Sequence, residues 1–237
     1  MNPEDFIQTV FVGLGDYGRE LGEILSRNWR SIHPLSICAP ASGERVDIES
    51  FFRNKDLIFI GCDSPEQANS LASIIRELAT PYLVLILHPR QHLDGTPDDT
   101  RDFGRLSTPQ TAEFPAGWDP VSALFGSLVN PGIIGVDLAD LKSVAHQKSG
   151  AVHVLQTEET LTPSRLDSWL SRINPGKSSG LYVIMEHRDD AELSVAQIDA
   201  FAETIHAFTD SETEIFYTAP FYAGPCPMSI TLIMFQG

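Results

Sequence analysis

The sequence is poor in cationic residues. Lysine and arginine together number 16, against 32 aspartates and glutamates, and the formal net charge is -16 with a pI of about 4.6. Proteins that bind nucleic acid need cationic side chains to neutralise phosphates, and peripheral docking on an anionic membrane needs them too. The composition therefore argues against nucleic acid and against a membrane surface as partners.

Cysteines and long hydrophobic runs are also scarce. Cys38, Cys62 and Cys226 are widely spaced and form no C-x-x-C motif, so neither a disulfide framework nor a thiolate zinc site is expected. His88 and His92 flank Pro89 in a polar segment, which makes a metal site there improbable, and we expect no bound metal. No apolar run approaches the ~18 residues of a membrane span, and the first residues lack the pattern of a signal peptide. These features predict a cytoplasmic protein.

Short apolar runs alternate with helical patterns in the first third of the chain. Strands are predicted at residues 9–12, 35–39, 57–60 and 82–87, with helices after the first and third strands. This order is typical of βαβ units and of a mainly parallel, Rossmann-like sheet. Residues 88–118 then lose all periodicity and are predicted to form a long loop.

The remainder of the chain predicts a smaller α+β unit behind a central helix. A helix is predicted through residue 128 with Asp119 as its cap, and another after the capping-box pair Ser194 and Gln197, with Val195 on its buried face. Further elements are predicted at residues 151–155, 163–173, 181–185, 214–218 and 229–235, the last two pairing as antiparallel strands. The fold class is α/β, divided into residues 1–118, 119–150 and 151–237.

Gly13, Gly15 and Gly18 follow the first predicted strand in G-x-G-x-x-G spacing. Such a turn lets a phosphate approach backbone amides at the start of a helix. The second predicted strand ends without the acidic residue that would hold a dinucleotide's ribose, which weakens a dehydrogenase interpretation. The alternative is that the glycines serve a tight turn and close helix packing, with no ligand.

Three further residues have both a chemical and a structural interpretation. Cys62 lies between a strand and a helix, where amides lower a thiol pKa, but no partner is evident and an inert cysteine is favoured. Asp137 and Asp140 are three residues apart where a loop becomes a helix. They can polarise a water for attack on a phosphoryl group or cap the helix, and taken alone the pattern favours capping.

The order of these pieces resembles the FtsZ/tubulin superfamily of polymerising GTPases, and FtsZ in particular. Residues 131–144, PGIIGVDLADLKSV, are similar to the catalytic loop of FtsZ, whose pattern is N-x-D-x-x-D. Asp137 and Asp140 fall on its two acids, and Gly135 replaces its asparagine. The segments TVFVGLGDYGREL, DLIFIG, GLYVIMEHRDDAELSVAQIDAFAETIHAF and SITLIMFQG resemble FtsZ elements in the same order, so the resemblance covers most of the chain.

The departures from that family concern the nucleotide. FtsZ has G-G-G-T-G-[ST]-G where this chain reads GCDSPEQ from Gly61. Asp63 and Glu66 bring negative charge to the place of the triphosphate, and Pro65 removes a backbone donor. The segment between residues 88 and 119 is shorter than in the family, without clear counterparts of the residues that read guanine. The sequence printed here ends after the last predicted strand, so FtsZ's C-terminal peptide has no counterpart and no direct membrane anchor is expected.

The resemblance and its departures together predict an FtsZ-like pseudo-GTPase that has lost GTP binding and acts in the cytoskeleton or cell division through protein contacts. We expect no cofactor and lean against enzymatic activity. The partner is expected to be an FtsZ-like protomer or a second copy of this chain. Contact would be made through the face formed by residues 135–140, from Gly135 to Asp140.

Two alternatives remain open. In a divergent polymerising GTPase, GTP or GDP with Mg²⁺ would be held by the nucleotide-site residues, and Asp137 and Asp140 would act in trans on a neighbour's nucleotide. Those nucleotide-site residues are Gly13, Gly15, Gly18, Gly61 and Ser64. The second alternative is a Rossmann-type protein that binds another small ligand.

Overall fold

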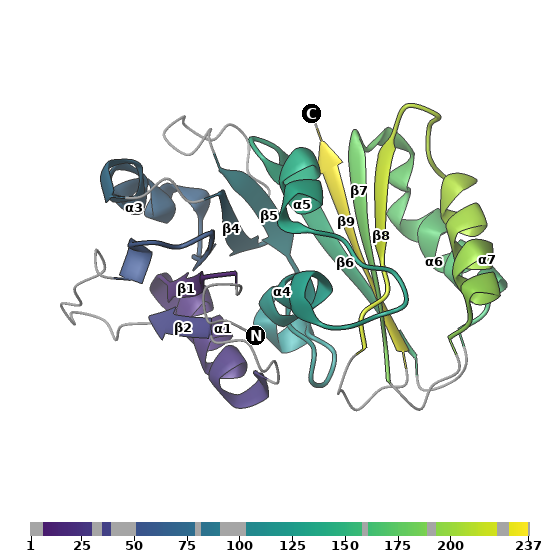
Figure 1. Cartoon of the computed structure of the whole chain (residues 1–237), viewed down its shortest axis with the longest axis horizontal. Coiled ribbons are helices and arrows are strands. Elements are labelled where there is room, and N and C mark those ends of the chain that lie inside the picture. Colours follow the sequence, from purple (N-terminus) through teal and green to yellow (C-terminus); the bar gives the residue numbers. More distant parts are fainter. Residues whose placement is uncertain are drawn as a thin grey trace.

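A single sheet runs through the whole molecule. The computed structural model describes residues 7–29, 35–38, 51–78, 82–90, 103–157, 161–188, 193–221 and 228–236. Nine strands of this part of the chain join in the order β2-β1-β3-β4-β5-β6-β9-β7-β8 (Figure 1). Their bounds are β1 Thr9–Gly13, β2 Leu35–Cys38, β3 Leu57–Gly61, β4 Leu83–Pro89, β5 Gly104–Thr108, β6 Ser149–Thr157, β7 Gly180–His187, β8 Glu214–Thr218 and β9 Met228–Gln236.

Helices cover both faces of the sheet. They are α1 Gly15–Asn28, α3 Pro65–Leu78, α4 Pro120–Val129, α5 Leu138–Ala145, α6 Pro163–Ile173 and α7 Val195–His206, with short 3₁₀ turns at Thr111–Glu113 and Pro175–Lys177. Buried residues of α1, α4 and α5 share one core with alternate residues of the strands. The other face of the sheet packs against α3 at one end and against α6 and α7 at the other. None of the helices in the described ranges combines the length and hydropathy that crossing a membrane requires.

The sheet is mostly parallel, and its one reversed strand is β9. The ladders that join β1 to β2 and β3, and β3 through β6, are all parallel, which confirms the α/β prediction and its mainly parallel N-terminal sheet. β9 lies between β6 and β7 and is antiparallel to both. The predicted pairing of β8 with β9 is wrong, because β8 pairs in parallel with β7. The nearly continuous apolar run of β9 fits a strand buried on both faces.

Part of the predicted long loop is a strand. Residues 104–108 form β5, which sits in the middle of the sheet between β4 and β6. Its sequence, GRLST, carries a weak strand signal because only Leu106 is a large apolar residue. The alternation of buried and half-buried positions along β5 reflects its place in the sheet. Residues 91–102 lie outside the described part of the chain.

Helix boundaries follow the sequence signals more closely. α6 has the predicted bounds and is capped by Thr162, whose side chain accepts a hydrogen bond from the Arg165 amide. Ser194 and Gln197 form the expected capping box of α7. Val195 is 61% exposed, so its predicted place on the buried face is wrong. The sheet passes without interruption through the three predicted segments, and the division at residues 118 and 150 stays a prediction.

Candidate functional site

The glycine turn lies at the carboxyl edge of β1 and β3. Gly13 and Gly61 end these two strands in register with each other. The amide of Leu14 donates to the carbonyl of Gly61 at 2.7 Å, which fixes the turn against β3. Gly15 begins α1 with a φ of 67°, a left-handed conformation that favours glycine.

Gly18 is the point of closest approach between α1 and the sheet. A Cβ atom at this position would lie 2.3 Å from the carbonyl oxygen of Gly61 and 2.9 Å from backbone atoms of Gly13. The third glycine of the motif therefore serves helix packing, which is the structural interpretation that the spacing left open. That packing places the first amides of α1 beside Asp63, which lies two residues after the end of β3.

The Asp63 carboxylate occupies the amides of the glycine turn. Its Oδ1 accepts a hydrogen bond from the amide of Tyr17 at 2.8 Å, and its Oδ2 accepts one from the amide of Asp16 at 3.2 Å. Both amides belong to the first turn of α1, where the partial positive charge of the helix favours an anion. A Cβ atom on Gly15 would come within 1.9 Å of Asp63 Oδ2, so the carboxylate lies directly against the turn. An internal anion thus takes the hydrogen bonds that a phosphate would accept.

Gln67 holds the Asp63 carboxylate in this position. The side-chain amide of Gln67 donates to Asp63 Oδ2 at 3.1 Å, and its oxygen accepts from the amide of Asp63 at 2.9 Å. Gln67 thus contacts both the backbone and the carboxylate of Asp63 at the start of α3. Partial burial works against the charged carboxylate, but the hydrogen bonds from Tyr17, Gln67 and Asp16 prevail and lower the pKa of Asp63. Asp63 is ionised at neutral pH.

The start of α3 adds a second negative charge. Glu66 lies exposed in its first turn, and a hydrogen bond with the side chain of Ser64 lowers the pKa of the Glu66 carboxyl. Ser64, one of the nucleotide-site residues of the GTPase alternative, thus has its side chain engaged by a neighbouring acid. Pro65 stands at the first position of α3 and offers no amide.

Tyr17 fills the space beneath the turn. Its side chain is 4% exposed, and its hydroxyl shares a 2.6 Å hydrogen bond with the hydroxyl of Thr108 at the end of β5. Burial raises the pKa of the Tyr17 phenol, so the group stays neutral. The Thr108 hydroxyl in turn lies within hydrogen-bond distance of the carbonyls of His88 and Pro109. A bulky side chain and its polar partners therefore stand behind the glycine turn.

Cys62 and His88 are buried at the same carboxyl edge of the sheet, just after β3 and near the end of β4. Burial raises the pKa of the Cys62 thiol to about 12, which fits the inert cysteine that the sequence favoured. Burial lowers the pKa of His88, whose Nδ1 lies 3.1 Å from the carbonyl of Pro89. The described ranges contain no group of three or more histidine, cysteine or acidic side chains arranged to hold a metal ion, and His92 falls outside them.

Asp137 and Asp140 form a capping box at the start of α5. Asp137 Oδ1 accepts hydrogen bonds from the amides of Ala139 and Asp140 at 2.7 and 3.0 Å. Asp140 Oδ2 accepts from the amide of Asp137 at 2.9 Å. All of these hydrogen bonds stay within the start of α5. The arrangement matches the capping interpretation, and a role in trans on a neighbour's nucleotide stays a prediction.

Removing the Asp63 side chain should destabilise the protein. Asp63→Ala leaves the amides of Asp16 and Tyr17 without their acceptor, and we expect the free energy of unfolding to fall by about 1–2 kcal/mol. Urea denaturation followed by circular dichroism measures the change. Glu77→Ala, which removes an exposed acid from the last turn of α3, is the matched control and should stay within about 0.5 kcal/mol. An equal effect of the two variants would contradict the role given to Asp63.

Sequence reasoning missed how Asp63 and Tyr17 are used. It treated Asp63 as a charge that repels phosphate and gave Tyr17 no role of its own. The contacts join residues 46 and 47 positions apart, which no local pattern encodes. A usable signal exists nevertheless, because the carboxyl ends of neighbouring parallel strands meet at one edge. An acid soon after β3 and glycines after β1 are therefore expected to lie together.

No protein-family model matches this sequence, and no curated protein matches it significantly. Similarity is found among solved structures. An empty FtsZ dimer from M. jannaschii superposes with a TM-score of 0.70 at 13% identity, covering 99% of this chain and 89% of that one.

Two other groups of structures are similar over comparable lengths. The GDP-bound monomer of CetZ1 from Haloferax volcanii gives a TM-score of 0.64 at 13% identity, covering 97% of this chain and 94% of that one. A GTPγS-form protofilament of TubZ from Bacillus thuringiensis serovar israelensis gives 0.63 at 11% identity, covering 98% and 88%. At such identities the likeness concerns the fold.

Proposed function

We propose, from the premise that this chain has the FtsZ/tubulin superfamily fold, that it works without a bound nucleotide and acts through protein contacts. On this proposal Asp63 replaces the phosphate that the glycine turn of a GTP-binding relative would hold. The protein then associates with an FtsZ-type protomer or filament, or with a second copy of itself, and modulates assembly.

The occupation of the turn amides by Asp63 is the observation that carries the proposal. The amides of Asp16 and Tyr17 donate to its two carboxylate oxygens at 3.2 and 2.8 Å. A phosphate that sought the same amides would have to displace a carboxylate that Gln67 also holds. The displaced carboxylate would then lie beside the phosphate as a like charge, which is costly at contact distance.

Other charges near the turn act in the same direction. Glu66 and Asp16 are exposed acids, and Arg19 forms an ion pair with Asp16. The Arg19 charge is thereby partly neutralised within the protein. A triphosphate at this edge would gain little electrostatic attraction, and this supports loss of GTP binding.

The face of residues 135–140 is the proposed contact surface. Pro131, Gly132 and Ile133, just before it, are exposed, and a Cβ atom at Gly135 would meet no atom within 4 Å. The preceding loop is anchored, since the amides of Ile133 and Ala219 exchange hydrogen bonds with the carbonyls of Ala219 and Ile134 at 3.0 and 2.9 Å. The similar structures include an FtsZ dimer and protofilaments of CetZ2 and TubZ, and association is therefore the proposed mode of action.

Mixing this protein with FtsZ and GTP tests the proposal. We expect a dose-dependent change in polymer mass by light scattering and in the rate of phosphate release. Equal masses of bovine serum albumin control for crowding. If neither quantity changes and the protein also sediments as a monomer at all concentrations, association through this fold is wrong.

One observation favours the second candidate, a divergent polymerising GTPase. Asp63 is only half-buried, so solvent and solutes reach its carboxylate. In this alternative GTP with Mg²⁺ displaces Asp63 from the amides, and Asp137 and Asp140 orient water on a neighbour's nucleotide. It requires micromolar affinity for GTP or GDP in the presence of Mg²⁺.

A further inference from the structure

Two fully buried carboxyl groups lie on the face of the sheet where α4 begins. Asp119, the N-cap of α4, is 1% exposed, and Glu186, near the end of β7, is 4% exposed. Glu186 faces Ser229 in register, and Trp118, the neighbour of Asp119, donates its indole hydrogen bond to Thr231 two residues along β9. Burial and the Asp119 charge both raise the pKa of Glu186. The pair is separate from the Asp63 carboxylate and from the face of residues 135–140.

Hydroxyl groups, and not cations, surround the pair. The Ser229 hydroxyl donates to Glu186 Oε2 at 3.0 Å from the position of β9 that faces Glu186 in register. The amide of Ser122 donates to Asp119 Oδ1 at 2.7 Å, while Asp119 Oδ2 is buried without a hydrogen-bond partner among the described residues. Two residues along β9, the Thr231 hydroxyl accepts from the indole of Trp118 at 2.9 Å.

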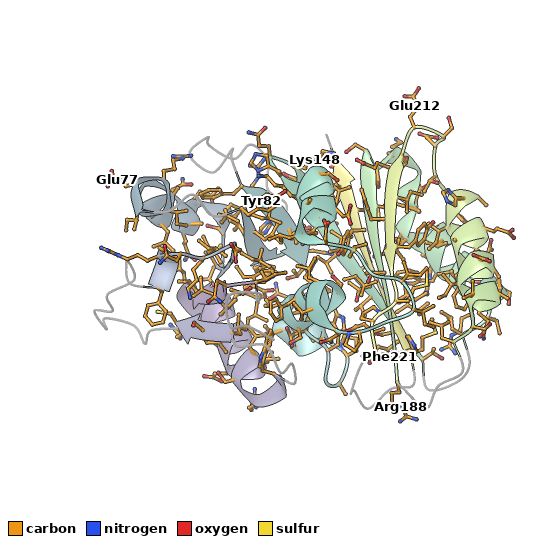
Figure 2. The ribbon with its side chains drawn as sticks, in the orientation of Figure 1. Glu77, Tyr82, Lys148, Arg188, Glu212 and Phe221 are labelled. Atoms are coloured by element: carbon orange, nitrogen blue, oxygen red, sulfur yellow. The ribbon has the colours of Figure 1, made fainter. Side chains whose placement is uncertain are left out.

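The remaining ionisable groups near the pair do not balance its charge. Tyr17 faces Asp119 from α1 and stays neutral, because burial raises its phenol pKa. His187 packs its ring on Phe221 at 4.9 Å, with its Nδ1 turned to the carbonyl of Met185. Arg188 points outward at the lower edge of the sheet (Figure 2). None of the groups found to act on either carboxyl in the described ranges is cationic.

Two buried negative charges without a counter-ion are unstable in a protein interior. We propose that Asp119 and Glu186 form a pH-sensitive latch, in which a proton held by Glu186 keeps the start of α4 fastened to β7 and β9. When Glu186 ionises, its proton passes to solvent and the two carboxylates repel each other. The packing of α4 against β7 and β9 then weakens. Because α4 lies beside Tyr17, this change also reaches the glycine turn.

The direction of the pH dependence follows from burial. Burial and the nearby Asp119 raise the pKa of Glu186 to about 7, and burial also raises the pKa of Asp119. An unfolded chain would ionise Glu186 near its ordinary pKa of about 4.3. The folded state therefore holds the proton more tightly, and the stability it gives is lost as pH rises from about 4.3 to about 7.

The test compares the full-length chain with Glu186→Gln, which keeps the shape and removes the ionisation. Between pH 5 and pH 8 the unfolding equilibrium constant of the wild type, relative to that of Glu186→Gln, should rise on the order of 50-fold. The ratio isolates Glu186, because the buried His88 and His153 titrate equally in both proteins. Glu203→Gln, an exposed acid on α7, should follow the wild type.

Infrared spectroscopy in D₂O gives a readout that does not depend on unfolding. The wild type at pH 6 should show the carbonyl band of a protonated, buried carboxylic acid, and Glu186→Gln should lose the part of that band that disappears in the wild type between pH 6 and pH 8. A ratio that stays constant with pH, or a pH-dependent band of equal intensity in the wild type and the variant, would overturn the latch. Stabilisation of the wild type but not of the variant by Mg²⁺ or Ca²⁺ at pH 8 would overturn it as well, since the pair would then hold a metal ion.

Discussion

Gly135→Arg is expected to weaken association with the partner at least tenfold while leaving the fold intact. A tenfold loss corresponds to about 1.4 kcal/mol of binding free energy. The substitution is tolerated because Gly135 is exposed, has no positive φ, and has no atom within 4 Å of the place where a Cβ would stand. The arginine side chain then projects from the face of residues 135–140 and blocks close approach.

The measurement is a titration of each variant into assembling FtsZ with GTP, read by light scattering and phosphate release, with sedimentation equilibrium for self-association. Val195→Arg places the same side chain on α7, at a residue that is 61% exposed, and should behave as wild type. Full activity of Gly135→Arg in both assays would remove this face from the proposal. An equal loss of association in both variants would mean that the added positive charge, and not its position on this face, causes the effect.

Gly18→Ala is expected to lower the free energy of unfolding by about 2–3 kcal/mol. The new Cβ would stand 2.3 Å from the carbonyl oxygen of Gly61 and 2.9 Å from backbone atoms of Gly13. Backbone cannot rotate away as a flexible side chain would, so α1 must shift from the sheet. That shift would also disturb the amides that bind Asp63. The gain in helix propensity of roughly 1 kcal/mol offsets only part of this cost.

Chemical denaturation of Gly18→Ala, with Gly135→Ala as the control, measures this effect. The control adds the same methyl group where a Cβ meets no atom within 4 Å, and should change the free energy of unfolding by less than about 0.5 kcal/mol. Similar values for the two variants would mean that α1 does not rest on the strand ends as closely as described.

Elements with strong local signals could be predicted from the sequence. α6 begins with Pro163 after a capping threonine, and α7 follows the capping box of Ser194 and Gln197, so both starts are written in adjacent residues. The catalytic-loop-like motif also led to the FtsZ/tubulin fold, although the identity to similar structures is 11–14%. Order of elements along the chain carried more information here than residue identity.

Features that depend on distant segments could not be predicted. β9 enters the sheet between β6 and β7, and its neighbours come from strands far from it in the sequence. β5 was missed because Gly104 and three polar residues dilute its strand pattern. Glu186 reads as one more charged residue at a strand end, and only packing against α4 and β9 shows that its carboxyl is buried.

Isothermal titration calorimetry with GTP and Mg²⁺ tests the central claim most directly. If the Asp63 carboxylate replaces phosphate at the amides of Asp16 and Tyr17, the wild-type protein should bind GTP no more tightly than about 1 mM, which corresponds to about 4 kcal/mol. The titration should then show no heat beyond dilution at micromolar nucleotide. Saturable binding of GTP in the micromolar range would contradict the account and establish the divergent GTPase in its place.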